Sequence, residues 1–325
     1  MKDFRSVNKA RKKAGKTMNR KRNQLIAFAL AAIIFVGAGS HTAKADDSRA
    51  ASVSYDGYAT DLSTLEREYL SLHTLQNKNI YAYNRLNVSI LGSSLSVKGF
   101  LASGAYYVPF RASANAIGAS YSYNSATKTA TMKIGSLTLV ATSGNYVVYA
   151  NGRPLFSTSP VVIMSDGRMY LTREVLAKAL GLTASGSSSI TLSGRLNPMG
   201  VAPYSDDEVF WLARIIHAES QGEPLLGQIA VGNVVLNRVR SPLYPNTIYG
   251  VIFDRNYGVQ FSPVLNGTIY NTPSYNSTLA AKICLEGFDL SGGALFFLHP
   301  ALSTSSWIPK TRYYAFSVGK HDFYN

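Results

Sequence analysis

Short apolar segments separated by turn residues fill the middle of the chain and predict β-strands. From about Asn84 the segments NVSILG, YYVPF, TATMKI, SLTLVA, NYVVYANG, VVIM and SITLSG are rich in β-branched and aromatic residues, with Gly, Asn and Ser between them. Two stretches repeat one another at an offset of 63 residues, Tyr107–Gly118 and Tyr170–Gly181. Each runs from a strand pattern through an Ala-rich helical pattern to a glycine suited to the left-handed end of a helix. We therefore expect a small α/β domain with an internal duplication over residues 84–194.

Helical spacing begins again after residue 204. Ser205 and Glu208 have the spacing of a capping box, which predicts a helix that starts here and runs through VFWLARIIHAES. Pro224 can open a second helix over Pro224–Arg240, whose apolar residues and two glycines suit close packing in a core. The stretch 195–204 holds two Pro and a Gly without periodicity, and we interpret it as a linker.

Glu219 lies near the end of the first of these helices. Leu212, Ile215 and Ile216 precede it at helical spacing, so its side chain projects from the apolar, core-facing stripe. Burial disfavours an ionised carboxylate and raises its pKa, which a general acid working near neutral pH requires. The alternative is a structural role, in which Glu219 pairs with Arg238 or Arg214 or caps a loop.

The first 45 residues have the pattern of a secretory signal. A strongly basic segment, Lys2–Arg22, precedes the 15-residue apolar run Leu25–Gly39, and Ala43-Lys44-Ala45 fits a cleavage site. The run is short for a membrane-spanning helix, although an uncleaved anchor is the alternative. Residues 46–83 are polar and Tyr-rich, with helical spacing at Leu65, Tyr69, Leu72 and Leu75, and they suggest no function.

Charge and composition argue against a nucleic-acid-binding protein. The formal net charge is +14, but residues 1–45 contribute eleven Lys and Arg against one Asp, which leaves 21 basic and 17 acidic residues in the remainder. A nearly balanced body does not suit a surface that tracks phosphates. The 46% hydrophobic content over 325 residues is enough for two globular cores.

Cysteine and histidine usage gives no metal or disulfide pattern. Cys284 is the single cysteine, so an intrachain disulfide is excluded, and its apolar helical context predicts a buried thiol. A zinc amidase would need ligands such as His217, His299 and His321, but no HExxH motif occurs. We expect no cofactor.

The C-terminal region resembles the spore-cortex-lytic (SleB/CwlJ-type) cell-wall hydrolase family. The resemblance rests on Ala213–Pro224 (ARIIHAESQGEP), GQIAVG, VLNRV, PNTI, GVI, QFSP, GGALFF and GKHDFY, in order over residues 205–325. It implies a lysozyme-like α+β catalytic domain that cleaves peptidoglycan glycan strands. By position, the first glutamate of the E-x-x-G-E stretch, Glu219, would be the catalytic acid.

Counting carboxylates leaves the mechanism open between two schemes. Glu223 is the close candidate for a second carboxylate, and Asp254 is a more distant one; a hydrolytic muramidase or glucosaminidase would need such a partner. A lytic transglycosylase needs Glu219 alone, and the resemblance favours this scheme.

Further residues of this region are candidates for contact with a glycan or with Glu219. Asn237 and Arg238 on the second helix could hydrogen-bond Glu219 or a loop carbonyl. The substrate-binding candidates combine polar groups with aromatic faces, as sugars require: Glu223, Thr247, Gln260, Phe261, Ser262, Tyr313 and Tyr314.

The region 84–194 resembles the copper-amine-oxidase N-terminal-like domain, also called a stalk domain. The resemblance rests on YVPFRASANAIGA, VYANGRP and YLTREVLAKALG, and it departs from the family pattern at Thr172-Arg173. It implies a spacer or envelope-attachment module, with a plain stability domain as the alternative. Copper binding is unsupported, since no histidine lies between 84 and 194.

Together these features predict a secreted protein of the cell wall or spore envelope that acts on peptidoglycan. Membrane contact would come only through an uncleaved signal, and the oligomeric state is left open. The rival from another class is a non-catalytic envelope-binding protein.

Overall fold

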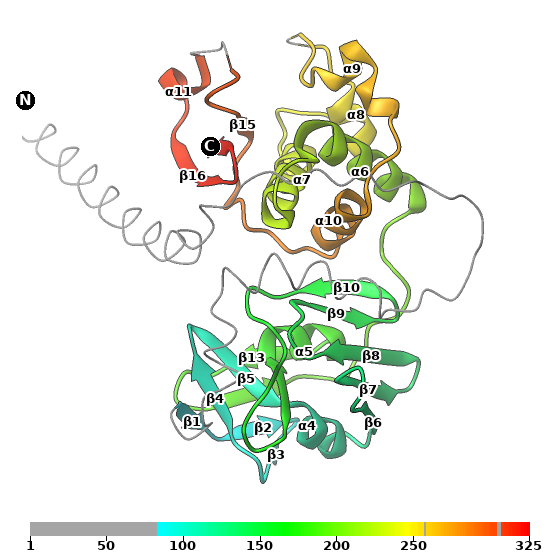
Figure 1. The fold of residues 1–325 in the computed structure, drawn as a ribbon, viewed down its shortest axis with the longest axis vertical. Helices are drawn as coiled ribbons and strands as arrows, with labels where there is room; N and C mark the ends of the chain where they lie inside the picture. Colours follow the sequence, from blue (N-terminus) through cyan, green and yellow to red (C-terminus); the bar gives the residue numbers. More distant parts are fainter. Residues whose placement is uncertain (1–82, 257, 304–306) are drawn as a thin grey trace, which may run out of the picture. The chain divides into compact units, whose positions relative to one another are not determined.

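The computed structural model describes residues 83–256, 258–303 and 307–325. They divide into two compact units, 83–203 and 204–325, which Figure 1 shows in cyan to green and in green to red. The predicted signal and the helical spacing of residues 65–75 lie outside the described residues. Among the helices of the described part, none is both long and apolar enough to cross a membrane.

The N-terminal unit is built from three small sheets and two short helices. Its strand orders are β1-β4-β5-β12-β11, β10-β9-β8-β7-β6 and β13-β14-β2-β3, with β14 and β2 parallel. The elements are β1 (Asn84–Leu86), β2 (Val88–Ile90), β3 (Ser93–Ser94), β4 (Gly99–Ala102), β5 (Ala105–Pro109), α4 (Phe110–Ala116), β6 (Ser120–Asn124), β7 (Thr129–Ile134), β8 (Leu137–Thr142), β9 (Val147–Ala150), β10 (Arg153–Phe156), β11 (Val162–Ile163), β12 (Met169–Thr172), α5 (Arg173–Leu180), β13 (Thr183–Ser185) and β14 (Ile190–Ser193).

Alternation of apolar residues explains why these strands form. In β7 and β8 every second side chain is buried, among them Met132 and Leu139, which pair across the sheet. These residues share one core with α5, whose Leu176 and Leu180 are fully buried. The predicted strands and both predicted helices are therefore confirmed.

The two similar stretches pair with each other in the middle of one sheet. β5 and β12 are antiparallel, with Val108 opposite Leu171 and Tyr107 opposite Thr172. At the offset of 63 residues, Val108 corresponds to Leu171, so the register relates the two strands by a local pseudo-twofold axis through this pair. Gly118 and Gly181 both have positive φ, as the helix-end pattern predicts. The internal duplication itself stays a prediction, with which this register agrees.

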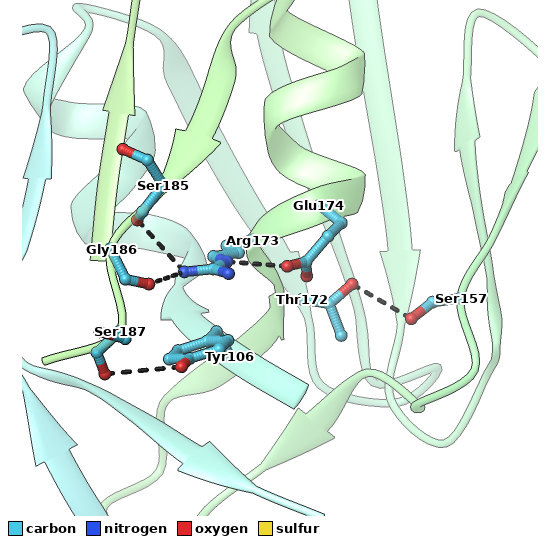
Figure 2. Close-up of polar contacts among 8 residues, drawn as sticks. All are labelled: Tyr106, Ser157, Thr172, Arg173, Glu174, Ser185, Gly186 and Ser187. Atoms are coloured by element: carbon cyan, nitrogen blue, oxygen red, sulfur yellow. Dashed lines mark hydrogen bonds and ion pairs between the residues drawn. The ribbon is translucent and has the colours of Figure 1, made fainter. Parts of the chain in front are cut away.

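Arg173, at the site where the sequence departs from the stalk pattern, ties a turn to a strand (Figure 2). Its guanidinium lies 3.7 Å from the centroid of the Tyr106 ring on β5, and its Nη1 donates to the carbonyls of Ser185 and Gly186 at the end of β13. The preceding Thr172 shares a hydrogen bond of 3.1 Å with the Ser157 hydroxyl. The departure from the pattern therefore stabilises this unit, because charged donors meet backbone acceptors at a partly buried site.

The C-terminal unit combines a helical layer with a small antiparallel sheet, which confirms the α+β class. Figure 1 shows α11 and the sheet on one side of α7, with α8 and α9 on the other. The elements are α6 (Asp206–Ser220), α7 (Leu225–Arg240), α8 (Ile248–Ile252), α9 (Pro263–Asn266), the 3-10 helix η3 (Thr268–Tyr270), α10 (Tyr275–Leu285), β15 (Phe296–Leu298), α11 (Trp307–Thr311), β16 (Tyr314–Val318) and β17 (His321–Tyr324).

The helices α6, α7 and α10 pack closely because small residues lie at their contacts. A Cβ at Gly232 of α7 would lie 2.7 Å from Cδ1 of Ile216 and 2.8 Å from Sγ of Cys284. Cys284 on α10 is buried and donates to the Ile229 carbonyl, and burial raises the pKa of its thiol. The predicted burial of this thiol is thus confirmed. The capping box of Ser205 and Glu208 at the start of α6 is also present.

The linker expected over 195–204 has no regular secondary structure. Its first part nevertheless belongs to the N-terminal unit: Asn197 and Met199 donate backbone hydrogen bonds to the carbonyls of Leu180 and Ala179. Tyr204 belongs to the C-terminal unit and donates its hydroxyl to Glu286. The domain boundaries proposed from the sequence stay predictions.

Candidate active site

Glu219 lies in the last turn of α6, immediately before a loop. Ile215 and Ile216, one turn earlier, are fully buried, and Ser220 after it is also buried. The Glu219 side chain itself is partly buried. The structure therefore places Glu219 on the core-facing side of α6 and at the end of this helix, as the sequence predicts.

The electrostatic setting of Glu219 favours its protonated form. Burial raises the pKa of Glu219 to about 7, and the positive charge of Arg238 opposes this rise. Among the described residues, none forms a hydrogen bond or a close ion pair with the Glu219 carboxyl. Arg214, one of the two partners considered for a structural role, instead donates to the carbonyls of Tyr270 and Asn271. A partly buried carboxyl with a pKa near neutrality is able to give and take a proton.

Arg238 on α7 is the residue whose positive charge lowers the pKa of Glu219. It is only 6% exposed, and its Nε donates to the Leu295 carbonyl at 2.8 Å. The rings of Tyr244 and Phe261 each lie 5.1 Å from its Cζ. Its Nη1 is buried and has no hydrogen-bond partner among the described residues. The contact with a loop carbonyl was one of the two alternatives expected for this residue.

Asn237 holds the loop before β15. Its Nδ2 donates to the Ser291 hydroxyl at 2.8 Å and to the Ala294 carbonyl at 3.0 Å. The sequence left two partners open for Asn237, Glu219 and a loop carbonyl. In the structure Asn237 binds the loop carbonyl. Asn237 and Arg238 thus fasten the loop 291–295, which leads into β15, to α7.

Glu223 is bound to the turn between β16 and β17. Its Oε2 accepts from the backbone N–H of Lys320 at 2.7 Å, and its Oε1 lies 4.0 Å from Nδ1 of His321. Gly319 permits this approach, since a Cβ there would fall 1.9 Å from Oε2. The sequence predicts that Glu223 contacts substrate. Its contacts instead favour a role in positioning the turn between β16 and β17.

Asp254 is the other carboxylate near the site. It is 8% exposed, and its Oδ1 accepts from the Asn256 N–H at 3.0 Å. Burial lowers the pKa of the Arg238 guanidinium, and the charges of Tyr244, Glu219 and Asp254 oppose this lowering. Arg238 therefore lies within electrostatic reach of both carboxylates.

One expected groove residue requires correction. Phe261 is 2% exposed and packs its ring against Arg238, so it offers no open face on which a sugar could stack. The aromatic position in the QFSP segment points inward because burying its ring stabilises the fold.

The other expected substrate-binding residues are at or near the surface. The Thr247 hydroxyl accepts from the Gly250 N–H and caps α8. Gln260 is half-buried and donates to the Gly258 carbonyl, and Ser262 is exposed. Tyr313 is 85% exposed, whereas Tyr314 shares a hydrogen bond with Ser317. Their contact with a substrate stays a prediction.

Sequence reasoning missed a group of residues next to Arg238. Phe296, Trp307 and Arg312 form a stack of rings and guanidiniums that begins at Arg238. Trp307 is one of only two tryptophans in the chain and lies in a polar context (SSWIPK), which was a signal for a surface role.

The described residues contain no group of three or more His, Cys, Asp or Glu that could hold a metal ion. Nδ1 of His217 accepts from the Ser274 N–H, whereas the rings of His299 and His321 lie 5.7 Å apart. Of these two histidines, His321 lies close to Glu223. In the N-terminal unit, residues 83–203 include no histidine or cysteine. That donor set does not suit copper, which prefers imidazole and thiolate ligands.

Two family matches divide the chain in the same way as the structure. Residues 222–324 match the family described as Cell Wall Hydrolase, and residues 89–191 match the one described as Copper amine oxidase N-terminal domain. The first match begins three residues after Glu219, which therefore lies just outside it.

Curated relatives match the chain as well. The chain is 35% identical over 167 residues to the spore cortex-lytic enzyme of Bacillus cereus, which covers 47% of this chain and 63% of that protein. It is 40% identical over 127 residues to the spore cortex-lytic enzyme of Halalkalibacterium halodurans, covering 38% of this chain and 36% of that protein. The chain thus spans less than two thirds of either relative.

A solved structure also matches. The catalytic domain of the germination-specific lytic transglycosylase SleB from Bacillus anthracis is 40% identical in sequence, with a TM-score of 0.36; the match covers 39% of this chain and 100% of that one.

Proposed function

Because residues 222–324 belong to the Cell Wall Hydrolase family, we propose that this chain cleaves the glycan strands of peptidoglycan, with Glu219 as its single catalytic acid and base. The relatives named as spore cortex-lytic enzymes support a substrate in the cell wall or spore cortex. The predicted signal supports a secreted protein of that envelope. The N-terminal unit would serve as a spacer or attachment module.

The observation that carries this proposal is the setting of Glu219. Its carboxyl is partly buried at a helix end, has a pKa of about 7, and has no hydrogen-bond partner among the described residues. A proton held at such a pKa is available to a glycosidic oxygen at neutral pH. The neighbouring Glu223 is already engaged by the Lys320 N–H, which supports a mechanism that uses one carboxylate.

In the lytic transglycosylase scheme, Glu219 acts twice. It first donates its proton to the leaving glycosidic oxygen as the bond to C1 of N-acetylmuramic acid breaks. The resulting carboxylate then removes the proton of the C6 hydroxyl, whose oxygen bonds to C1 and closes a 1,6-anhydro ring. Glu219 is protonated again at the end, and no water is consumed. The Arg238 guanidinium would stabilise the carboxylate between the two steps.

A hydrolytic muramidase or glucosaminidase is the second candidate. Asp254 favours it, because this buried carboxylate acts on the same arginine as Glu219. Glycosidases of this kind use two carboxylates that flank the scissile bond. A non-catalytic envelope-binding protein is the rival from another class.

Mass spectrometry of the products tests the proposal. The full chain is incubated with purified peptidoglycan, and the soluble muropeptides are weighed. Ends that carry 1,6-anhydro-N-acetylmuramic acid are expected, each one water lighter than a reducing end. Reducing ends would support the hydrolytic candidate instead, and an absence of soluble fragments would support the binding protein.

The rate of cleavage is expected to fall as the pH rises through about 7. The first step needs protonated Glu219, and burial raises the pKa of this group to about 7. Above that pH the rate should drop about tenfold per unit. Arg238 lowers this pKa, so Arg238→Met should move the fall to higher pH. Initial rates from pH 5 to 9 check both statements; a flat profile between pH 6 and 8 would contradict them.

A further inference from the structure

A continuous stack of aromatic rings and guanidiniums connects the surroundings of Glu219 to the protein surface. It starts at Arg238, whose Cζ lies 5.7 Å from the centroid of the Phe296 ring. On the same ring lies the guanidinium of Arg312, at 4.5 Å. Arg312 also lies 4.9 Å from the Trp307 ring, which is 5.9 Å from the ring of Phe296 and nearly perpendicular to it, at 75°.

The two ends of this stack differ in their exposure. Arg238 is 6% exposed and carries the buried Nη1 that has no partner among the described residues. Trp307 is 51% exposed, and Arg312 is also exposed. The stack therefore leads outward from the buried Arg238 to Trp307, about half of whose side chain is exposed. Phe296 belongs to β15 and Trp307 to α11, which Figure 1 shows on the side of α7 opposite α8 and α9.

The chemistry of the outer end suits an acylated sugar that carries a peptide. An indole ring offers a large flat face with a polar edge, and the C–H faces of pyranose rings pack on such surfaces. The guanidinium of Arg312 between two rings fixes the orientation of Trp307, so less freedom is lost on binding. A planar guanidinium with outward donors also binds carboxylates, which the stem peptides of peptidoglycan provide.

We propose that Trp307 and Arg312 form an outer glycan subsite of the active site, in which Trp307 stacks on a sugar ring and Arg312 binds a carboxylate of the attached stem peptide. This inference rests on the proposed function, since it assigns the substrate to the same site. It commits to a peptide-bearing glycan strand rather than to a bare sugar chain. The alternative is that the stack only stabilises α11 against β15.

The first test measures binding without cleavage. Sedimentation of the full chain with insoluble peptidoglycan is compared for Glu219→Gln alone and combined with Trp307→Ala, Trp307→Phe or Arg312→Lys. Trp307→Ala is expected to weaken retention about tenfold, and Trp307→Phe to restore part of it. Tyr270→Ala is the matched control, because Tyr270 is 63% exposed, lies on η3 and has no ring contact with the stack.

The second test separates the sugar from the peptide. With soluble glycan oligomers, Trp307→Ala should raise KM about tenfold and change kcat less than twofold. Arg312→Ala should raise KM only for oligomers that carry stem peptides. Equal KM and retention in all variants would overturn the subsite, as would a loss confined to thermal stability. If Glu219→Gln cleaves as fast as the wild type, the proposed function fails, while sedimentation still reports on the subsite.

Discussion

Glu219→Gln is expected to reduce the rate of glycan cleavage by about 10²–10⁴-fold, the range that a single general acid or base contributes. Glutamine keeps the size of the side chain but supplies no proton to the leaving oxygen. Clearance of a turbid peptidoglycan suspension gives the rate. Glu174→Gln on α5 is the matched control, because this exposed glutamate lies in the other unit and forms an ion pair with its neighbour Arg173. Equal clearance by wild type and Glu219→Gln would remove Glu219 from the catalytic role.

The same substitution is expected to stabilise the fold at alkaline pH. The folded-state pKa of Glu219, about 7, lies above the ordinary value of 4.5, so the fold favours the protonated form. The fold therefore pays no penalty for ionising this group well below pH 4.5, where the carboxyl is protonated in both the folded and the unfolded chain. As the pH rises from 4.5 to 7, the unfolded chain ionises first, and the free energy of unfolding falls. Glu219→Gln should increase the free energy of unfolding by roughly 1–3 kcal/mol at pH 8 and leave it unchanged at pH 4. Denaturant unfolding at the two pH values measures this difference without any substrate.

Gly232→Val is expected to destabilise the C-terminal unit by about 1–3 kcal/mol, the usual cost of overpacking a core. Even a Cβ at this position would lie 2.7 Å from Ile216 and 2.8 Å from Cys284, so α6 and α10 would have to move apart. Because Glu219 follows Ile216 on the same helix, activity should fall together with stability. Thermal unfolding followed by circular dichroism gives the size of the effect.

Gly222→Ala is the control for this prediction. A Cβ at Gly222 meets no atom within 4 Å, and its φ is not in the left-handed region. Its melting temperature should match that of the wild type. A melting temperature for Gly232→Val equal to that of Gly222→Ala would show that α6 and α10 have room to adjust.

Local patterns were enough to predict most elements of the fold. The strands around Met132 and Leu139 alternate cleanly, and the capping box at Ser205 marks the start of α6, because such signals depend on neighbouring residues. Strand β4 was missed since it opens with Gly99, which sequence rules place in turns. There the glycine is needed for close approach, as its Cβ would lie 2.3 Å from the Tyr107 carbonyl oxygen.

The candidate site was only partly predictable. Periodicity correctly put Glu219 on the buried side of its helix, because burial on a helix follows from spacing alone. It could not show that Phe261 packs inward on Arg238 or that Glu223 meets Lys320, which lies 97 residues away. Trp307 escaped notice for the same reason: its relation to Arg238 runs through Phe296 and exists only in three dimensions.

The order of strands in the small sheet affects how this domain is made. β17 (His321–Tyr324) lies between β15 and β16 and pairs with both, and the β16–β17 turn is held by Glu223. Each outer strand therefore has no partner in the sheet until residues 321–324 have been synthesised. The sheet can therefore form only after residues 321–324 have been translated. Until then Glu223, in the loop after Glu219, lacks its hydrogen bond from the Lys320 N–H.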